Sequence, residues 1–298
     1  MATPAEWLEG ARLRTLPAAV APVVAGSAVA LFGGGLHLAR AALALVVALA
    51  LQVGVNYSND YSDGIRGTDS AEHRAGPQRL VGSGAAAPSR VRAAAFACFG
   101  LACAAGLAIV VLTGAWWLLV VGAACVLAAW FYTGGRRPYG YAGLGEAFVF
   151  VFFGLVATCG TAYVNLLRVP EAAIWAGVGT GALACAILVA NNLRDIEGDA
   201  RVGKRTLAVR LGDARTRWLF VFCAFGGVFG FFEAAASTTW WGLLALVAAV
   251  LLAGPVRLVL GGAAGPALIR VLKLTGIAEL AASVLLFLGL FVGVWVGR

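Results

Sequence analysis

The sequence predicts an all-α membrane protein, a bundle of about nine transmembrane helices. Composition is the first reason: 61% of the 298 residues are hydrophobic and 12% are charged, whereas soluble domains usually contain about 25% charged residues. The second reason is that apolar segments long enough to cross a hydrocarbon core of about 30 Å recur along the whole chain. Residues 1–298 are therefore expected to form a single multi-pass domain in the cell membrane.

Nine apolar segments, each near the length of about 17–25 residues that a membrane-spanning helix needs, account for the predicted bundle. The first follows Arg12 and Arg14 and contains Ala28 and Ala30 at the spacing of a signal-peptidase site. A cleaved signal peptide is the alternative, but the rest of the chain is itself apolar, so we expect a retained first span. The predicted spans are 16–32, 41–59, 91–112, 116–131, 144–164, 172–193, 218–236, 240–260 and 277–296.

The distribution of basic residues predicts that the N-terminus lies in the cytoplasm. In this orientation only Arg40, Arg168 and Arg298 of the 22 lysines and arginines fall on the outer side, as the positive-inside rule requires. Trp116 and Trp240 begin spans at the outer face, where aromatic anchors are common. The net charge of +8 follows from this topology and from attraction to anionic headgroups. We therefore expect membrane lipid, and no nucleic acid, as a partner.

Two clusters of asparagine and aspartate end the second and sixth spans on the cytoplasmic side. In a continued helix the side chains at 191, 195 and 199 share one face, as do those at 56, 60 and 63. The likeness of the clusters predicts a pseudo-repeat, about 1–135 and 136–298, whose halves face one site. The candidate catalytic residues and metal ligands are Asp60, Asp63, Asp69, Asp195 and Asp199, with Asn59 and Asn191 beside them.

The chemistry of these clusters indicates a divalent metal ion. Helix C-termini carry negative partial charge, so gathered carboxylates there repel both the dipole and one another. A cation relieves this repulsion, and all-oxygen ligands favour a hard cation such as Mg²⁺, whose other ligands are often substrate phosphates. One such cluster alone could equally be solvated loop charge, but two matching clusters favour a site. The six cysteines lack metal-binding spacing and the two histidines are isolated, so we expect no sulfur or imidazole site.

Basic residues near the clusters are candidates for binding a diphosphate. Arginine can grip phosphate oxygens in a bidentate manner, and lysine acts as a point charge. Taken singly, each is also typical of a cytoplasmic loop under the charge rule. Glu146, just inside the fifth span, is a further candidate because acids within membrane spans are usually functional. The candidate phosphate ligands are Arg74, Arg79, Arg136, Arg137, Lys204 and Arg205.

With these motifs the chain resembles the UbiA superfamily of intramembrane prenyltransferases, and within it those that use 1,4-dihydroxy-2-naphthoate. The likeness spans nearly the whole chain and is most telling from Asp195 to Val209. It implies a nine-helix bundle around a lipid-accessible cavity, with two aspartate motifs that bind Mg²⁺ and diphosphate. It also implies a cytoplasmic cap of loops and short helices over the active site. Tyr132 matches a diphosphate-contacting position; four residues later stands Arg136, where lysine is commoner, so Arg137 stays an alternative.

The resemblance implies Mg²⁺-dependent transfer of a polyprenyl group from polyprenyl diphosphate to 1,4-dihydroxy-2-naphthoate. Loss of the carboxylate accompanies the transfer and gives demethylmenaquinone, in menaquinone synthesis. We expect Glu146 to orient or deprotonate a ring hydroxyl. The active site is expected to face the cytoplasm.

Two alternatives remain open from the sequence. Prenyl transfer to 4-hydroxybenzoate, homogentisate or haem would use the same motifs. A secondary transporter also combines repeats with intramembrane acids, but its site would lie near the bilayer midplane. The aspartates here gather instead at one face.

Overall fold

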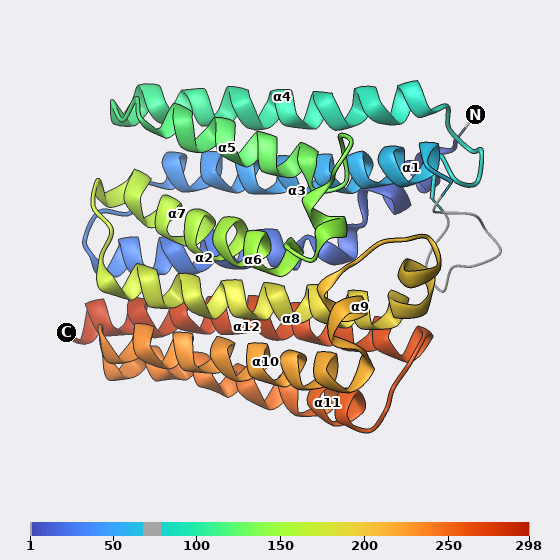
Figure 1. The fold of residues 1–298 in the computed structure, drawn as a ribbon. Helices are drawn as coiled ribbons and strands as arrows, with labels where there is room; N and C mark the ends of the chain where they lie inside the picture. The colour runs from blue at the N-terminus through green and yellow to red at the C-terminus, as the bar shows by residue number, and fades with distance from the viewer. Residues whose placement is uncertain (1, 68–78, 298) are drawn as a thin grey trace.

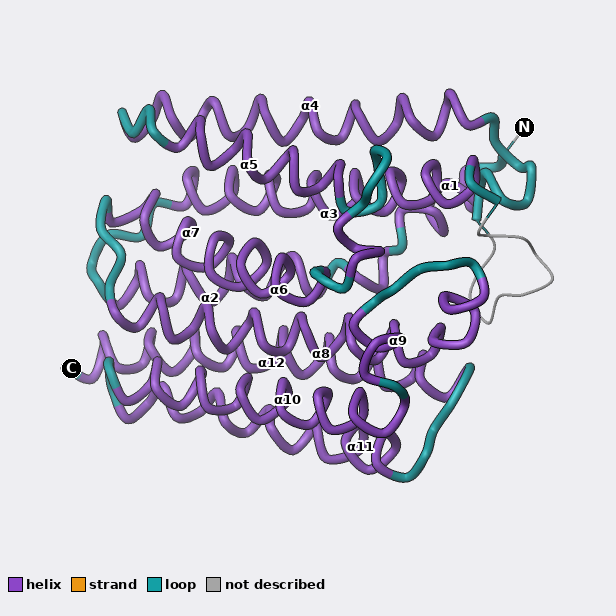
Figure 2. Tube along the Cα trace, viewed as in Figure 1, coloured by secondary structure: helices purple, strands orange, loops and turns teal. Residues whose placement is uncertain are grey.

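The computed structural model describes residues 2–67 and 79–297, and this part of the chain contains helices and no strands (Figures 1 and 2). Every predicted apolar segment is helical. The fifth is divided into α6 (Gly145–Val149), the π-helical turn η4 (Phe150–Val156) and α7 (Ala157–Leu166), and the eighth into the 3₁₀ helix η5 (Trp240–Ala249) and α11 (Val250–Leu260). The other long helices are α2 (Pro17–Phe32), α3 (Leu38–Ile65), α4 (Pro88–Thr113), α5 (Leu118–Phe131), α8 (Glu171–Arg201), α10 (Asp213–Ala236) and α12 (Pro266–Val296).

Seven of the described helical segments are long and apolar enough to cross a membrane. An eighth candidate is the pair Pro4–Thr15 and Pro17–Phe32, which is bent by 48°. The remaining predicted span, α5, has 14 residues, which at about 1.5 Å per residue is shorter than a hydrocarbon core. The structure therefore supports a multi-pass membrane protein with seven or eight spans by length and composition, against the nine expected.

The helices lie side by side, with the two chain termini at opposite ends of the bundle (Figure 1). α10 packs on α8, α3 on α4, and α12 on both α2 and η5. The largest buried cluster is rich in alanine, including Ala25, Ala28 and Ala176. Small side chains let helix backbones approach closely, which is the usual basis of packing between membrane helices.

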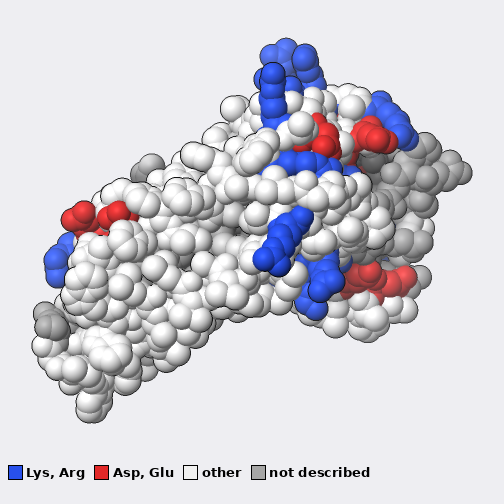
Figure 3. Space-filling view, turned by 90° about the horizontal axis from the view of Figure 1, so that it is seen from below, with Lys and Arg blue, Asp and Glu red and all other residues white. Residues whose placement is uncertain are grey.

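On the face seen in Figure 3, charged side chains form a small group at one end and a larger group over the opposite part of the molecule, and the band between the two groups is uncharged. Exposed leucine, valine, phenylalanine and tryptophan side chains instead cover much of the described surface. An uncharged apolar band between two charged regions matches the profile of a bilayer.

Gly154 in η4 lies where the fifth span and α8 approach each other closely. A Cβ atom built on Gly154 would lie 2.5 Å from the Cα atom of Gly181 and 2.6 Å from the carbonyl oxygen of Gly177. These neighbours are backbone atoms, which cannot move aside as a flexible side chain could. The two helices can therefore meet here only because none of these three positions carries a side chain.

Gly154→Ala is expected to lower the stability of the folded protein by about 1–3 kcal/mol, because the added methyl group forces α8 away from η4. Thermal unfolding in detergent measures this as a lower melting temperature. The matched control is Gly160→Ala in α7, where a Cβ atom meets no heavy atom within 4 Å. Equal melting temperatures for the two variants would contradict the steric explanation.

Candidate active site

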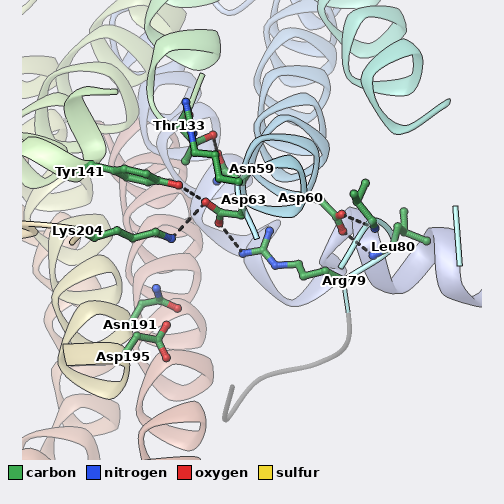
Figure 4. A network of polar contacts seen from close by, with 12 residues as sticks. Asn59, Asp60, Asp63, Arg79, Leu80, Thr133, Tyr141, Asn191, Asp195 and Lys204 are labelled. Atoms are coloured by element: carbon green, nitrogen blue, oxygen red, sulfur yellow. Dashed lines mark hydrogen bonds and ion pairs between the residues drawn. The ribbon is translucent and has the colours of Figure 1, made fainter. Parts of the chain in front are cut away.

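The first aspartate motif lies on the last two turns of α3, since the helix continues through it to Ile65. Asp63 is buried and accepts contacts from at least three separate parts of the chain (Figure 4). Its Oδ1 atom accepts hydrogen bonds from the Tyr141 hydroxyl and, at 3.2 Å, from Lys204 Nζ, and its Oδ2 atom lies 3.5 Å from an Arg79 nitrogen. Asp63 thus joins two predicted phosphate ligands at one carboxylate.

Asp60, also buried, faces another direction in Figure 4. Its two carboxylate oxygens accept hydrogen bonds from the backbone N–H groups of Leu80 and Val81, both at 2.9 Å. Such bonds satisfy backbone donors that would otherwise be buried and unpaired. Asp60 therefore fastens the chain directly after Arg79 and helps to place that arginine.

Asn59 connects α3 to the loop that follows α5. The Thr133 hydroxyl donates to Asn59 Oδ1 at 2.7 Å, and the Arg66 guanidinium donates to the backbone oxygens of Thr133 and Gly135. The same guanidinium lies 5.4 Å from the centre of the Tyr141 ring. These contacts hold the loop that carries Tyr132 against the first motif.

Tyr141 is a site residue that sequence reasoning missed. Lys204 Nζ lies 4.6 Å from the centre of the Tyr141 ring, within the range of a cation–π contact. Burial, and then the neighbouring Asp63 carboxylate, raise the pKa of the Tyr141 hydroxyl. The hydroxyl consequently stays protonated at neutral pH and donates to Asp63.

The second motif lies near the C-terminal end of α8, where Arg194 links two of its members. The guanidinium donates to Asp195 Oδ1 at 2.8 Å and to Asn191 Oδ1 at 2.9 Å. Beyond the helix, the Lys204 backbone N–H donates to the Asp199 carbonyl oxygen at 2.9 Å. Since the Lys204 side chain reaches Asp63, it bridges the two aspartate motifs.

A cavity with an empty volume of about 810 Å³, which includes space open to solvent, connects the two motifs. Asp60 and Arg79 line it from the first half of the chain, and Asn191 and Arg194 from α8. Three further cations, which the sequence motifs do not indicate, also line the cavity. They are Arg12 and Arg14 from the N-terminal segment, and Lys273 from α12.

The N-terminal segment is held over this cavity by α3. Asn56 donates to the Ala11 carbonyl oxygen at 2.9 Å and to the Thr15 hydroxyl at 3.1 Å, and the Tyr57 hydroxyl donates to the Trp7 carbonyl oxygen at 2.9 Å. Asn56 is therefore a structural partner of the cavity wall. The helical spacing of Asn56 and Asp60 indicated that the two residues share a face, but it did not indicate that Asn56 would bind the N-terminal segment.

The remaining predicted residues differ in where they lie. Asp69 and Arg74 fall outside the described residues. Arg136, Arg137 and Arg205 are exposed, and the Arg205 backbone N–H donates to the Tyr141 carbonyl oxygen at 2.9 Å.

Glu146 occupies a second buried polar cluster, deeper in the bundle at the start of α6. Its Oε1 atom accepts a hydrogen bond from Asn192 Nδ2 at 2.9 Å. Its Oε2 atom is buried and has no hydrogen-bond partner among the residues that the structure describes. Tyr132 lies beside this cluster, because a Cβ atom built on Gly145 would stand 3.7 Å from its hydroxyl oxygen.

The donor chemistry of the two motifs suits a hard cation, but the carboxylates are engaged within the protein. Across residues 2–67 and 79–297, no three acidic, histidine or cysteine side chains are close enough together to hold a metal ion. Asp63 pairs with Arg79 and Lys204, and Asp195 with Arg194. Carboxylates on facing helices with cations between them fit a site whose metal ion arrives together with phosphate oxygens.

Comparison with known proteins gives the family. Residues 19–277 match the UbiA prenyltransferase family. A 1,4-dihydroxy-2-naphthoate octaprenyltransferase of Mycobacterium tuberculosis is 55% identical over 287 residues, which cover 94% of each chain. The Escherichia coli protein of the same name is 36% identical over 296 residues, covering 97% of this chain and 96% of that one.

Solved structures show the same fold at low sequence identity. A UbiA homolog from Aeropyrum pernix has a TM-score of 0.71 at 15% identity and covers 93% of this chain and 98% of its own. A homolog from Archaeoglobus fulgidus, bound to GPP and Mg²⁺, has a TM-score of 0.66 at 12% identity and covers 94% and 99%. The resemblance inferred from the motifs is thereby confirmed, and the chain belongs to the UbiA prenyltransferase family.

Proposed function

We propose that this protein transfers a polyprenyl group from polyprenyl diphosphate to 1,4-dihydroxy-2-naphthoate with loss of the carboxylate, in menaquinone synthesis. The observation that carries this proposal is 55% identity along 94% of both chains with a protein named for that reaction. Relatives with the same name at 36% and 35% identity support naphthoate, rather than hydroxybenzoate, homogentisate or haem, as the acceptor.

We also propose that the bundle crosses the membrane nine times, with the N-terminus and the active site on the cytoplasmic side of the cell membrane. The short α5 and the bent first helix would then be spans, and the basic loops would lie inside, as the positive-inside rule favours. The site's placement at one end of the bundle argues against a transporter, whose site would lie near the midplane. In membrane vesicles, cysteine labelling at Arg90→Cys and Arg168→Cys should give opposite accessibility; equal accessibility would contradict this topology.

The diphosphate of the donor would bind between the two aspartate motifs. Arg79 and Lys204 would transfer their hydrogen bonds from Asp63 to phosphate oxygens, with Asn191 and Arg194 on the opposite wall. Asp69, Arg74, Tyr132, Arg136, Arg137 and Arg205 remain proposed contributors to the same site.

Asp63, Asp195 and Asp199 would hold Mg²⁺, with Asp60 and Asp69 as further candidates. When bound, the metal ion supplies positive charge that draws electron density from the diphosphate leaving group. Archaeal homologs solved with GPP or DMAPP and Mg²⁺ are consistent with this arrangement. Within the chain, Asp60 would act chiefly by holding the segment that presents Arg79.

In the transfer, the allylic C–O bond breaks and the diphosphate leaves with the bonding electron pair. Arg79 and Lys204 stabilise the negative charge that develops on it. The electron-rich ring carbon then forms the new C–C bond with the allylic cation, and the carboxylate departs as carbon dioxide. The apolar helices around the site exclude water, which would otherwise capture the cation. Glu146 orients the acceptor hydroxyl or accepts its proton.

The acceptor assignment is tested with purified protein in detergent, labelled polyprenyl diphosphate and Mg²⁺. We expect a prenylated naphthoquinol and released carbon dioxide with 1,4-dihydroxy-2-naphthoate, and no prenylated product with 4-hydroxybenzoate. Preferential prenylation of hydroxybenzoate would overturn the acceptor, and absence of any prenylated product would overturn the activity.

Glu146→Gln is expected to lower kcat about 100-fold, because glutamine keeps the size of the side chain but cannot accept a proton. Product formation under saturating substrates measures the effect. The matched control is Glu233→Gln near the far end of α10, which should leave the rate unchanged. A fully active Glu146→Gln variant would remove Glu146 from the mechanism.

A further inference from the structure

We propose that Asn192 is a positioning residue that orients the Glu146 carboxylate toward the aromatic acceptor. This inference rests on the function proposed above, and it assigns a role to a residue that the aspartate motifs do not include. Both side chains are buried, and Asn192 Nδ2 donates to Glu146 Oε1 at 2.9 Å across the contact between α8 and α6. A carboxylate can only accept hydrogen bonds, so the amide nitrogen must face Glu146.

The contact leaves the two oxygens of Glu146 in different situations. Oε1 is held by Asn192, whereas Oε2 is buried and has no hydrogen-bond partner in the described part of the chain. A buried polar atom without a partner is costly and calls for an explanation. A hydroxyl of the acceptor supplies the missing donor, and Asn192 determines which oxygen remains available to it.

The face of α8 that carries Asn192 fits closely around Glu146. One turn and two turns earlier, Leu188 and Cys185 point to the same segment. The Cys185 thiol donates to the Glu146 carbonyl oxygen at 3.1 Å, and a Cβ atom on Gly145 would stand 3.3 Å from Leu188. Both the backbone and the carboxylate of Glu146 are therefore held by one helix face.

Asn191 and Asn192 are neighbours with different tasks. Successive helical residues point about 100° apart, and Asn191 lines the open cavity whereas Asn192 turns to Glu146. In this way α8 carries both the donor-binding motif and the residue that holds the acceptor-side acid, Glu146 of α6. The position of the diphosphate leaving group relative to the aromatic acceptor then depends on this one helix.

A double-mutant cycle tests the proposal, using Asn192→Ala, Glu146→Gln and the double variant. We expect Asn192→Ala to lower kcat about 10–100-fold, as small misplacements of a catalytic group do, with the KM for polyprenyl diphosphate unchanged. In the Glu146→Gln background, Asn192→Ala should have no further effect, because the oriented group is already lost. A structural role would instead give multiplicative losses, and that result would overturn the proposal.

Two controls complete the design. Asn165→Ala removes another buried asparagine at the opposite end of the bundle, where its side chain bonds His37 and the Thr161 carbonyl oxygen; it should leave kcat unchanged in the folded fraction. If Asn192→Ala does not fold, Asn192→Ser removes the amide with a smaller loss of volume and is read in the same way. Wild-type turnover of dihydroxynaphthoate reports on the proposed function alone, so its failure is distinct from failure of the cycle.

Discussion

Chelation of divalent metal ions with EDTA is expected to abolish prenyl transfer, and added Mg²⁺ is expected to restore it. Asp60 of the first motif and Asn191 of the second line one cavity, together with arginine side chains. A diphosphate leaving group carries several negative charges, and charge of this kind is usually neutralised by a divalent ion together with basic residues. Because Arg79, Arg194 and Lys204 are already paired with carboxylates, we expect these cations alone to be insufficient. Labelled product formation measures the effect.

The chelation experiment has a direct control. EDTA with a molar excess of Mg²⁺ should give the untreated rate, which separates metal removal from damage by the chelator. The affinity for polyprenyl diphosphate, measured in an equilibrium binding assay, should fall in EDTA in parallel with the rate of product formation. Full turnover in EDTA after dialysis would contradict a metal-dependent mechanism.

Asp63→Asn is expected to reduce the rate of prenyl transfer by about 10²–10³-fold or more, the scale of losing one electrostatic contact to the reacting groups. Asparagine keeps the shape of the side chain but removes the negative charge that is shared with Arg79, Lys204 and the Tyr141 hydroxyl. The loss should appear in kcat and in the concentration of Mg²⁺ needed for half-maximal activity.

The matched control for Asp63→Asn is Asp213→Asn. Asp213 also pairs with an arginine, Arg217, at 2.6 Å, but its carboxylate is largely exposed at the start of α10. Exposed pairs contribute little, about 0–1 kcal/mol, and this one is not part of the cavity wall. If Asp213→Asn lowered activity as much as Asp63→Asn did, a general effect of charge on the protein would explain both results.

Much of the fold could be predicted because long apolar segments in a sequence indicate membrane-spanning helices. All nine apolar segments are helical, and α3 continues six residues beyond the predicted end at Asn59, to Ile65, so the condition under which Asn56, Asp60 and Asp63 share one face is met. The π-helical turn in the fifth span could not be predicted, since it accompanies the backbone contact of Gly154 with α8, a tertiary interaction. The span count also exceeded what length and composition support, because α5 is short.

The site residues that belong to a repeated sequence motif could be predicted, and those that lie outside such a motif could not. The aspartates appeared as two similar clusters, but Arg12 and Lys273 join the cavity from distant segments that share no motif with them. Arg194 could have been found from its helical spacing with Asn191. Tyr141 gave no sequence signal, because its contacts with Asp63, Lys204 and Arg66 form only in the folded chain.

The Asp63 carboxylate also links three loops that are remote from one another in the sequence. Arg79 precedes α4, Tyr141 lies in the 3₁₀ turn between α5 and α6, and Lys204 follows α8. Each connection is thus fitted to the other two through one shared carboxylate. In a chimera that takes only one of these loops from a relative, the new loop would not match the other two in its contacts around Asp63. Functional exchange between relatives therefore requires all three loops to be transferred together.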